Sequence, residues 1–252
     1  MRLYYSNRDN RLGDEIQMTA LLKHLLHKGI EIDYHDHKGL AIFPDNLVNF
    51  VHGNNGLAWL ETRNLWIWAP LLRSRGIYTE VRTTACDPDI DIVMAPVVRP
   101  AYNKNREFSR DKISTLFSLI ISRWPNSVLV VDAAHKGLIT QTDNVVFSDS
   151  FPQTFDLIRR SKVFLGGDTG TSHYAGAIGH PRMVLLYPDM SHDQTAFQGE
   201  VEFMAKHFAE PDFLLYKWDS TPCCDPSHTT ILRIDADLQA VADALEACLL
   251  KQ

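Results

Sequence analysis

The sequence of 252 residues has little cysteine, no long apolar run and no surplus of positive charge. Its four cysteines include no C-x-x-C pair, so the ligand spacing of a zinc site is absent. Cys223 and Cys224 are adjacent, and adjacent residues rarely form an unstrained disulfide. We therefore expect reduced thiols, as in a cytoplasmic protein.

The charge balance, with 25 Lys and Arg against 31 Asp and Glu, gives a net charge of -6. A dedicated nucleic-acid-binding protein usually has a basic surplus, so we expect no nucleic-acid partner. No apolar run approaches the ~20 residues of a membrane-spanning helix. Residues 1–7 also lack the apolar segment and cleavage site of a signal peptide.

The dinucleotide fingerprint G-x-G-x-x-G is missing as well, which argues against a dinucleotide site. His35-Asp36-His37 offers two histidines without a third ligand, so we predict no metal site.

What the sequence does contain is an alternation of short apolar runs with amphipathic helical segments. It predicts strands at 3–6, 30–34, 46–51, 90–95, 128–131, 144–147, 162–166 and 183–187. It predicts helices at 14–28, after Ser109, at 152–160, at 170–179 and after a cap at Asp235 or Asp237. Residues 52–89 have a poor pattern, apart from a short helix expected at 70–76.

Such alternation predicts an α/β fold with parallel sheets. We expect two Rossmann-like doubly wound lobes, residues 1–97 and 98–252, with a hinge in the proline-flanked loop 96–104. Ligands are then expected at the carboxyl ends of the strands, in a central cleft that both lobes face.

The most informative segment is the glycine-rich turn that joins the predicted strand 162–166 to the small-residue helix 170–179. A turn of this kind points backbone N–H groups and the positive end of the helix dipole at one place, which suits a phosphate or pyrophosphate. Asp168 and His173 add a carboxylate and an imidazole. The alternative is a purely structural turn, capped by Asp168 or Thr169.

Gly167-Asp168-Thr169-Gly170, followed by His173, Ala175, Ala177, Gly179 and Pro181, resembles the signature of the bacterial lipopolysaccharide heptosyltransferases, glycosyltransferase family 9. The resemblance implies a GT-B fold. It also implies that Asp168, Thr169, Gly170, Thr171 and His173 bind the diphosphate and sugar of a nucleotide-sugar donor.

A second match lies near the amino terminus. Arg11-Leu12-Gly13-Asp14, followed by Thr19-Ala20-Leu21, resembles the opening Leu-Gly-Asp and Thr-Pro-x-Leu pattern of the same family, with Ala20 where proline is usual. The resemblance makes Asp14 the catalytic base. The alternative is that Asp14 only caps the helix at 14–28.

A third match, residues 99–108, resembles the family's Pro-Gly-x…Lys-x-Trp segment, although the Pro-Gly is missing and Phe108 stands for tryptophan. The resemblance makes Lys104, or failing that Arg106, the cation facing the donor phosphates. A solvated basic loop is the alternative.

Taken together, the resemblance implies an inverting, metal-independent glycosyltransferase without a cofactor. Its default donor is ADP-heptose, and its acceptor is a saccharide, a glycolipid or another hydroxyl. The expected location is the cytoplasm, with peripheral contact at the inner membrane for a lipid-linked acceptor; the sequence does not indicate an oligomeric state. The chain is short for the family, and the missing length falls in 36–96. Two alternatives stay open: a sugar-nucleotide epimerase or hydrolase of the same fold, and a non-catalytic nucleotide-sugar or glycan-binding relative.

Overall fold

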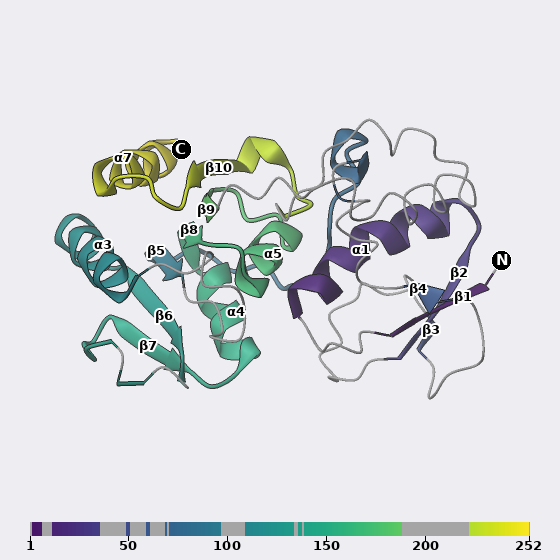
Figure 1. Ribbon diagram of the computed structural model, residues 1–252, viewed down its shortest axis with the longest axis horizontal. Helices are drawn as coiled ribbons and strands as arrows, with labels where there is room; N and C mark the ends of the chain where they lie inside the picture. The colour runs from purple at the N-terminus through teal and green to yellow at the C-terminus, as the bar shows by residue number, and fades with distance from the viewer. Residues whose placement is uncertain are drawn as a thin grey trace. The chain divides into compact units, whose positions relative to one another are not determined.

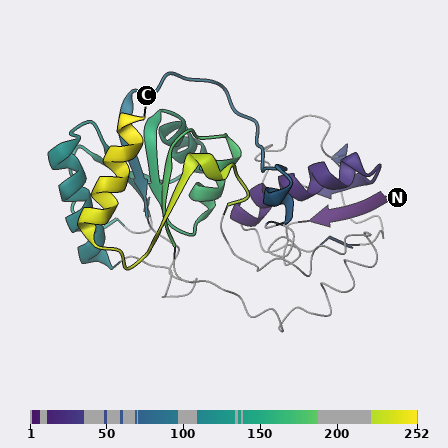
Figure 2. The same ribbon diagram turned by 90° about the horizontal axis from the view of Figure 1, so that it is seen from above.

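The computed structural model describes residues 2–6, 12–35, 49–50, 59–60, 69, 71–96, 109–133, 136–137, 139–187 and 222–251. The chain divides into two compact units, drawn in Figures 1 and 2. Unit 1 comprises Met1–Thr83, Gly176–Ile178 and Met190–Asp225. Unit 2 comprises Thr84–Ala175, Gly179–Asp189 and Pro226–Gln252.

Unit 1 contains a parallel sheet in the order β3-β2-β1-β4. Its strands are β1 (Arg2–Ser6), β2 (Glu31–His35), β3 (Asn49–Phe50) and β4 (Trp59–Leu60). Helix α1 (Leu12–His27) follows β1 and packs against β2. Its core is apolar, with Ile16, Met18, Leu21 and Leu22 fully buried.

Unit 2 contains a parallel sheet in the order β10-β9-β8-β5-β6-β7. Its strands are β5 (Ile90–Ala95), β6 (Val128–Asp132), β7 (Val145–Ser148), β8 (Ser161–Gly166), β9 (Met183–Tyr187) and β10 (Thr229–Arg233). Its helices are α3 (Arg110–Arg123), α4 (Phe151–Arg159), α5 (Gly170–Ala177) and α7 (Leu238–Leu250), with the last two residues of α5 counted in unit 1. A single turn of 3-10 helix, η5 (Pro226–His228), precedes β10.

Helices cover both faces of this second sheet (Figures 1 and 2). Helices α3 and α7 pack on the face that carries Ile92, Met94, Val163 and Leu165. The alternate strand positions, such as Phe164 and Gly166, belong to the opposite face, which α4 and α5 cover. A strand buried on both faces has no polar alternation, which explains the continuous apolar runs of the sequence.

Counted from β7, the strands follow the order third, second, first, fourth, fifth and sixth in the chain. This is the order of a doubly wound Rossmann sheet, in which the chain reverses direction across the sheet between the first and fourth strands. The reversal lies between β5 and β8 here. Open α/β sheets bind ligands at the carboxyl ends of the strands flanking that point.

The division between the two units falls earlier in the chain than the sequence predicts. Strand β5 pairs with both β8 and β6, so residues 90–95 are central to unit 2 and not the last strand of a lobe ending at residue 97. Unit 2 begins at Thr84. Pro96 ends the stretch that follows β5, and residues 97–104 of the predicted hinge lie outside the described residues.

The chain is hydrogen-bonded to unit 1 before this boundary and to unit 2 after it. In unit 1, Thr79 donates from both its amide and its hydroxyl to the carbonyl of Cys223, at 2.8 Å each. In unit 2, Asp89 accepts from Nε and Nη2 of Arg160 at 2.8 and 2.5 Å. The first passage of the chain from unit 1 to unit 2 therefore lies upstream of β5, where Thr83 meets Thr84.

All four cysteines are free thiols, and three of them, Cys223, Cys224 and Cys248, are buried. None of the helices within the described ranges has the length and apolarity needed to cross a bilayer.

Candidate functional site

The turn between β8 and α5 is held by hydrogen bonds to its own backbone. The amide of Thr169 donates to the carbonyl of Gly167 at 2.9 Å, and the hydroxyl of Ser172 donates to the same carbonyl at 2.5 Å. The amides of Ser172 and His173 donate to the carbonyl of Thr169 at 3.1 and 3.2 Å, which closes the first turn of α5. Ser172 therefore ties the start of the helix to the end of the strand.

Gly166 is required by close packing. A Cβ at this position lies 2.5 Å from Oγ of Ser172 and 2.6 Å from a ring carbon of Phe164, and both of those side chains are fully buried. Gly167 has more room, with the carbonyl oxygens of Leu186 and Pro96 at 3.6 and 3.9 Å from a Cβ. The turn thus lies beside Pro96, the residue that follows β5, at the reversal point of the sheet.

The beginning of α5 presents polar groups to an incoming anion. The hydroxyls of Thr169 and Thr171 are 2.6 Å apart, and residues 169–171 are half-buried. The N–H groups of a first helical turn have no acceptor within the helix. Together with the helix dipole, they attract phosphate oxygens.

Asp168 and His173 are more deeply placed than the threonines, with 7% and 5% of their surface exposed. Asp168 precedes the helix and His173 lies four residues after Thr169, one helical turn along. A carboxylate accepts hydrogen bonds from hydroxyl groups, and an imidazole donates or accepts them. The predicted donor-binding residues 168–171 and 173 therefore form one continuous turn.

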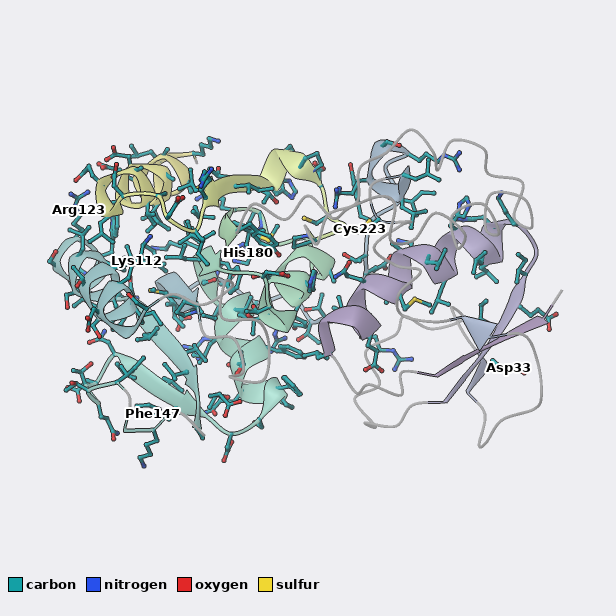
Figure 3. The ribbon with its side chains drawn as sticks, viewed as in Figure 1. Asp33, Lys112, Arg123, Phe147, His180 and Cys223 are labelled. Atoms are coloured by element: carbon teal, nitrogen blue, oxygen red, sulfur yellow. The ribbon has the colours of Figure 1, made fainter. Side chains whose placement is uncertain are left out.

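The far end of α5 is fixed by a buried histidine (Figure 3). Gly179 has a φ of 66° and ends the helix, and the amide of His180 donates back to the carbonyl of Ala175 at 3.0 Å. The ring of His180 contacts Ser161 at the start of β8, with Nε2 3.0 Å from the hydroxyl. Burial lowers the pKa of His180 to about 4, so the ring is neutral near pH 7.

Aromatic packing fixes the orientation of α5 against α4. The rings of Phe155 and Tyr174 stack with centroids 3.6 Å apart and an interplanar angle of 4°. Tyr174 follows His173 directly, so this contact and the His180 contact hold the helix from its side and its end. The candidate phosphate site therefore rests on a rigid support.

The structure describes less of the other predicted site residues, Asp14, Lys104 and Arg106. Helix α1 begins at Leu12, so Asp14 is its third residue and not the cap that the structural alternative requires. Asp14 follows β1, which lies beside β4 where the strand order of unit 1 reverses. The side chain of Asp14 is not described, and Lys104 and Arg106 lie outside the described residues.

Sequence reasoning missed two polar residues of unit 2. Ser172 is the third residue of α5, and the sequence shows only a hydroxyl near the start of a helix. Nothing in the sequence predicts its hydrogen bond to the carbonyl of Gly167. Asp132 ends β6 at the same carboxyl edge as the turn, and only its place after an apolar run marks it. Among the residues that the structure describes, no three His, Cys, Asp or Glu side chains gather as a metal site.

No family model matches the sequence, and no curated protein matches it. Solved structures do match. A glycosyl transferase family 9 structure from Veillonella parvula DSM 2008 has a TM-score of 0.63 at 10% identity, covering 100% of this chain and 98% of that one. E. coli heptosyltransferase WaaC with ADP-2-deoxy-2-fluoro heptose has a TM-score of 0.51 at 13% identity, covering 98% and 99%.

A third match is the iron-containing dodecameric glycosyltransferase TibC from enterotoxigenic E. coli H10407. Its TM-score is 0.50 at 13% identity, and the match covers 74% of this chain and 58% of that one. At these identities the likeness concerns the fold, and the expected architecture is confirmed. The chain has the GT-B-like α/β fold of the glycosyltransferase family 9 and heptosyltransferase structures.

Proposed function

We propose that this protein is an inverting, metal-independent glycosyltransferase that moves a sugar from a nucleoside diphosphate to a hydroxyl acceptor. The observation that carries the proposal is the β8–α5 turn at the reversal point of a Rossmann-like sheet. It combines a helix start suited to phosphate with a buried carboxylate and imidazole suited to sugar hydroxyls. The fold shared with family 9 and heptosyltransferase structures supports it.

In this proposal the donor lies across the start of α5. The amides of Gly170 and Thr171 and the hydroxyls of Thr169 and Thr171 bind the diphosphate, while Asp168 and His173 bind the transferred sugar. Lys104, or failing that Arg106, supplies a cation to the phosphates. ADP-heptose is the default donor, and the complex of WaaC with ADP-2-deoxy-2-fluoro heptose supports this choice.

The chemistry requires a base on the acceptor and charge stabilisation on the leaving group. Asp14 takes the proton of the acceptor hydroxyl as its oxygen attacks the anomeric carbon. The bond from that carbon to the diphosphate oxygen breaks, and the electron pair stays with the diphosphate. The N–H groups of α5 and the basic side chain stabilise this charge, so no metal is needed. A single displacement inverts the anomeric configuration.

We further propose that the acceptor is a saccharide or glycolipid, reached from the cytoplasm at the inner membrane face. Residues 1–83, which precede unit 2 in the chain, belong to the acceptor side of the protein.

The test compares Asp14→Asn with Glu31→Gln, which removes an exposed carboxylate from β2 of the same unit. Donor binding is measured by calorimetry, and transfer by mass spectrometry with a panel of saccharide acceptors. We expect Asp14→Asn to bind donor as the wild type does and to transfer at least about 100-fold more slowly, as expected for loss of a general base. Glu31→Gln should match the wild type. Retained transfer by Asp14→Asn would overturn the assignment of the base.

A further inference from the structure

We propose that Thr79 and Cys224 are positioning residues of the transfer reaction. They belong to a bridge, formed by residues 79–80 and 222–224, that connects two helices. One helix is α1, which carries the proposed base Asp14. The other is α5, whose carboxyl end contacts the bridge and whose start carries the candidate phosphate site. This inference rests on the proposed function and extends it to residues outside the donor-binding turn.

The bridge is joined to α1 at Thr19. The hydroxyl of Thr19 accepts a hydrogen bond from the amide of Glu80 at 2.9 Å and donates one to the carbonyl of Ile16 at 2.7 Å. One turn further along α1, the ammonium group of Lys23 forms a 2.7 Å ion pair with the carboxylate of Glu80. Thr19 is fully buried, and Asp14 precedes it by five residues, about 7.5 Å along a helix axis.

Thr79 joins the two halves of the bridge. Its amide and its hydroxyl both donate to the carbonyl of Cys223 at 2.8 Å. The thiol of Cys223, labelled in Figure 3, donates to the carbonyls of Ile77 and Ala69 at 3.4 and 3.7 Å. Thr79 and Cys223 have 5% and 1% of their surface exposed. Buried hydrogen bonds therefore hold together two segments that lie 144 residues apart in the chain.

Cys224 joins the bridge to α5 by close packing. A Cβ on Gly176 would lie 2.9 Å from the Cβ and 3.3 Å from the Sγ of Cys224, so a side chain at this position would displace the cysteine. Gly176 and Ala177, the last residues of α5, are counted in unit 1 together with residues 1–83 and 190–225. The bridge thus connects α1 to the end of α5 within one compact unit.

A bridge to one end of α5 restrains the other end as well. The backbone of a helix is hydrogen-bonded along its length, and Gly170 lies about 9 Å from Gly176 along the axis. Transfer in a single displacement requires the base, the acceptor and the donor to be held in line, and a misplacement of about 1 Å can slow such a reaction about 100-fold. We infer that the bridge supplies part of this alignment.

Amide exchange distinguishes positioning from a merely structural role. The amide of Thr79 exchanges with solvent when its hydrogen bond to Cys223 opens. A structural role makes this opening independent of a ligand at the start of α5. A positioning role couples the two, so that a bound nucleotide opposes the opening of the bridge.

The experiment follows amide exchange by NMR, with and without whichever of ADP, UDP and GDP calorimetry finds to bind most tightly. Thr79→Val removes the hydroxyl and keeps the shape, Thr79→Ser keeps the hydroxyl, and Gly176→Ala displaces Cys224. Thr154→Val is the matched control, because it removes a hydroxyl of similar burial that is bonded to Ser148 in unit 2.

In the wild type the nucleotide should slow exchange of the residue 79 amide at least about threefold, and should change the amides of β2 less than this. Thr79→Ser and Thr154→Val should keep the slowing. Thr79→Val and Gly176→Ala should reduce it to less than about 1.5-fold, because each breaks one junction of the bridge.

Transfer, measured with the donor and acceptor panel of the Asp14 test, gives a second readout. Thr79→Val and Gly176→Ala should lower kcat at least about fivefold and leave the donor KM within about twofold, since the phosphate site stays intact while the alignment is lost. Thr79→Ser and Thr154→Val should keep the wild-type kcat.

The outcomes separate the two proposals. A wild type that binds none of the three nucleotides overturns the proposed function itself. Binding that leaves the exchange of residue 79 unchanged in the wild type overturns the bridge and leaves the function standing. So does slowing that persists in both Thr79→Val and Gly176→Ala, or slowing that is lost equally in Thr154→Val. Should the variants fail to fold, the comparison of residue 79 with β2 in the wild type still decides.

Discussion

Replacing Gly166 by alanine tests whether close packing of the β8–α5 turn holds the candidate phosphate site in place. The new Cβ would lie 2.5 Å from Oγ of Ser172 and 2.6 and 2.7 Å from two ring carbons of Phe164. Neither neighbour has exposed surface into which it can move. At Gly167 the nearest atoms are 3.6 and 3.9 Å away, an ordinary contact distance. Gly167→Ala is therefore the matched control.

The expected magnitude follows from these contacts. Forcing a methyl group into a filled core costs about 1–3 kcal/mol, and losing the Ser172–Gly167 hydrogen bond adds about 1 kcal/mol. We expect Gly166→Ala to lower the free energy of unfolding by about 2–4 kcal/mol. Gly167→Ala should change it by less than about 0.5 kcal/mol.

Urea unfolding followed by circular dichroism measures the free energy of unfolding of both variants, and calorimetry measures their affinity for ADP. Because Ser172 joins the strand end to the first turn of α5, Gly166→Ala should also weaken ADP binding where the variant remains folded. Equal unfolding free energies for the two glycine variants would refute the packing argument.

Two further predictions concern elements around the site. Asp237 accepts a hydrogen bond from the amide of Ala240 at 2.7 Å and caps α7. Asp237→Ala should lower the free energy of unfolding by about 1 kcal/mol, whereas Asp235→Ala, at an exposed site, should change it little. Equal effects of the two substitutions would contradict the assignment of the cap. His180 has a pKa of about 4 in the folded protein, against an ordinary value of 6.5. Between these pH values the unfolded state therefore binds one more proton than the folded state. The stability that is present above pH 6.5 is lost as the pH falls toward 4. Between pH 7 and 5 the wild type should lose about 2 kcal/mol through this group, a loss that urea unfolding should not find in His180→Gln.

Local chemistry made the β8–α5 turn predictable. The apolar run before Gly166 predicts a buried strand, and the left-handed Gly179 marks the end of the helix. The cap of the last helix was left open between Asp235 and Asp237. The structure decides for Asp237, because Asp235 instead pairs with the exposed Arg233.

Long-range pairing was not predictable in the same way. The run Ile90–Ala95 shows that the strand is buried, but its partner Ser161–Gly166 lies about 70 residues later in the chain. No local signal assigns β5 to unit 2, so the predicted boundary at residue 97 and the boundary at Thr84 differ.

Weak strands were missed for a different reason. Strand β10 is at the edge of its sheet and carries two threonines and a half-exposed Ile231, so its apolar signal is diluted. Strand β4 has two residues, too few for any periodicity to appear.

The central claim, that the start of α5 binds the diphosphate of a nucleotide, is tested most directly by titrating ¹⁵N-labelled protein with ADP, UDP and GDP. The amide resonances of Gly170 and Thr171 should shift saturably, and adenosine without phosphates should leave them nearly unchanged. Two results would contradict the account. One is saturable shifts of other resonances while the amides of Gly170 and Thr171 stay unmoved; the other is the absence of any shift with all three nucleotides.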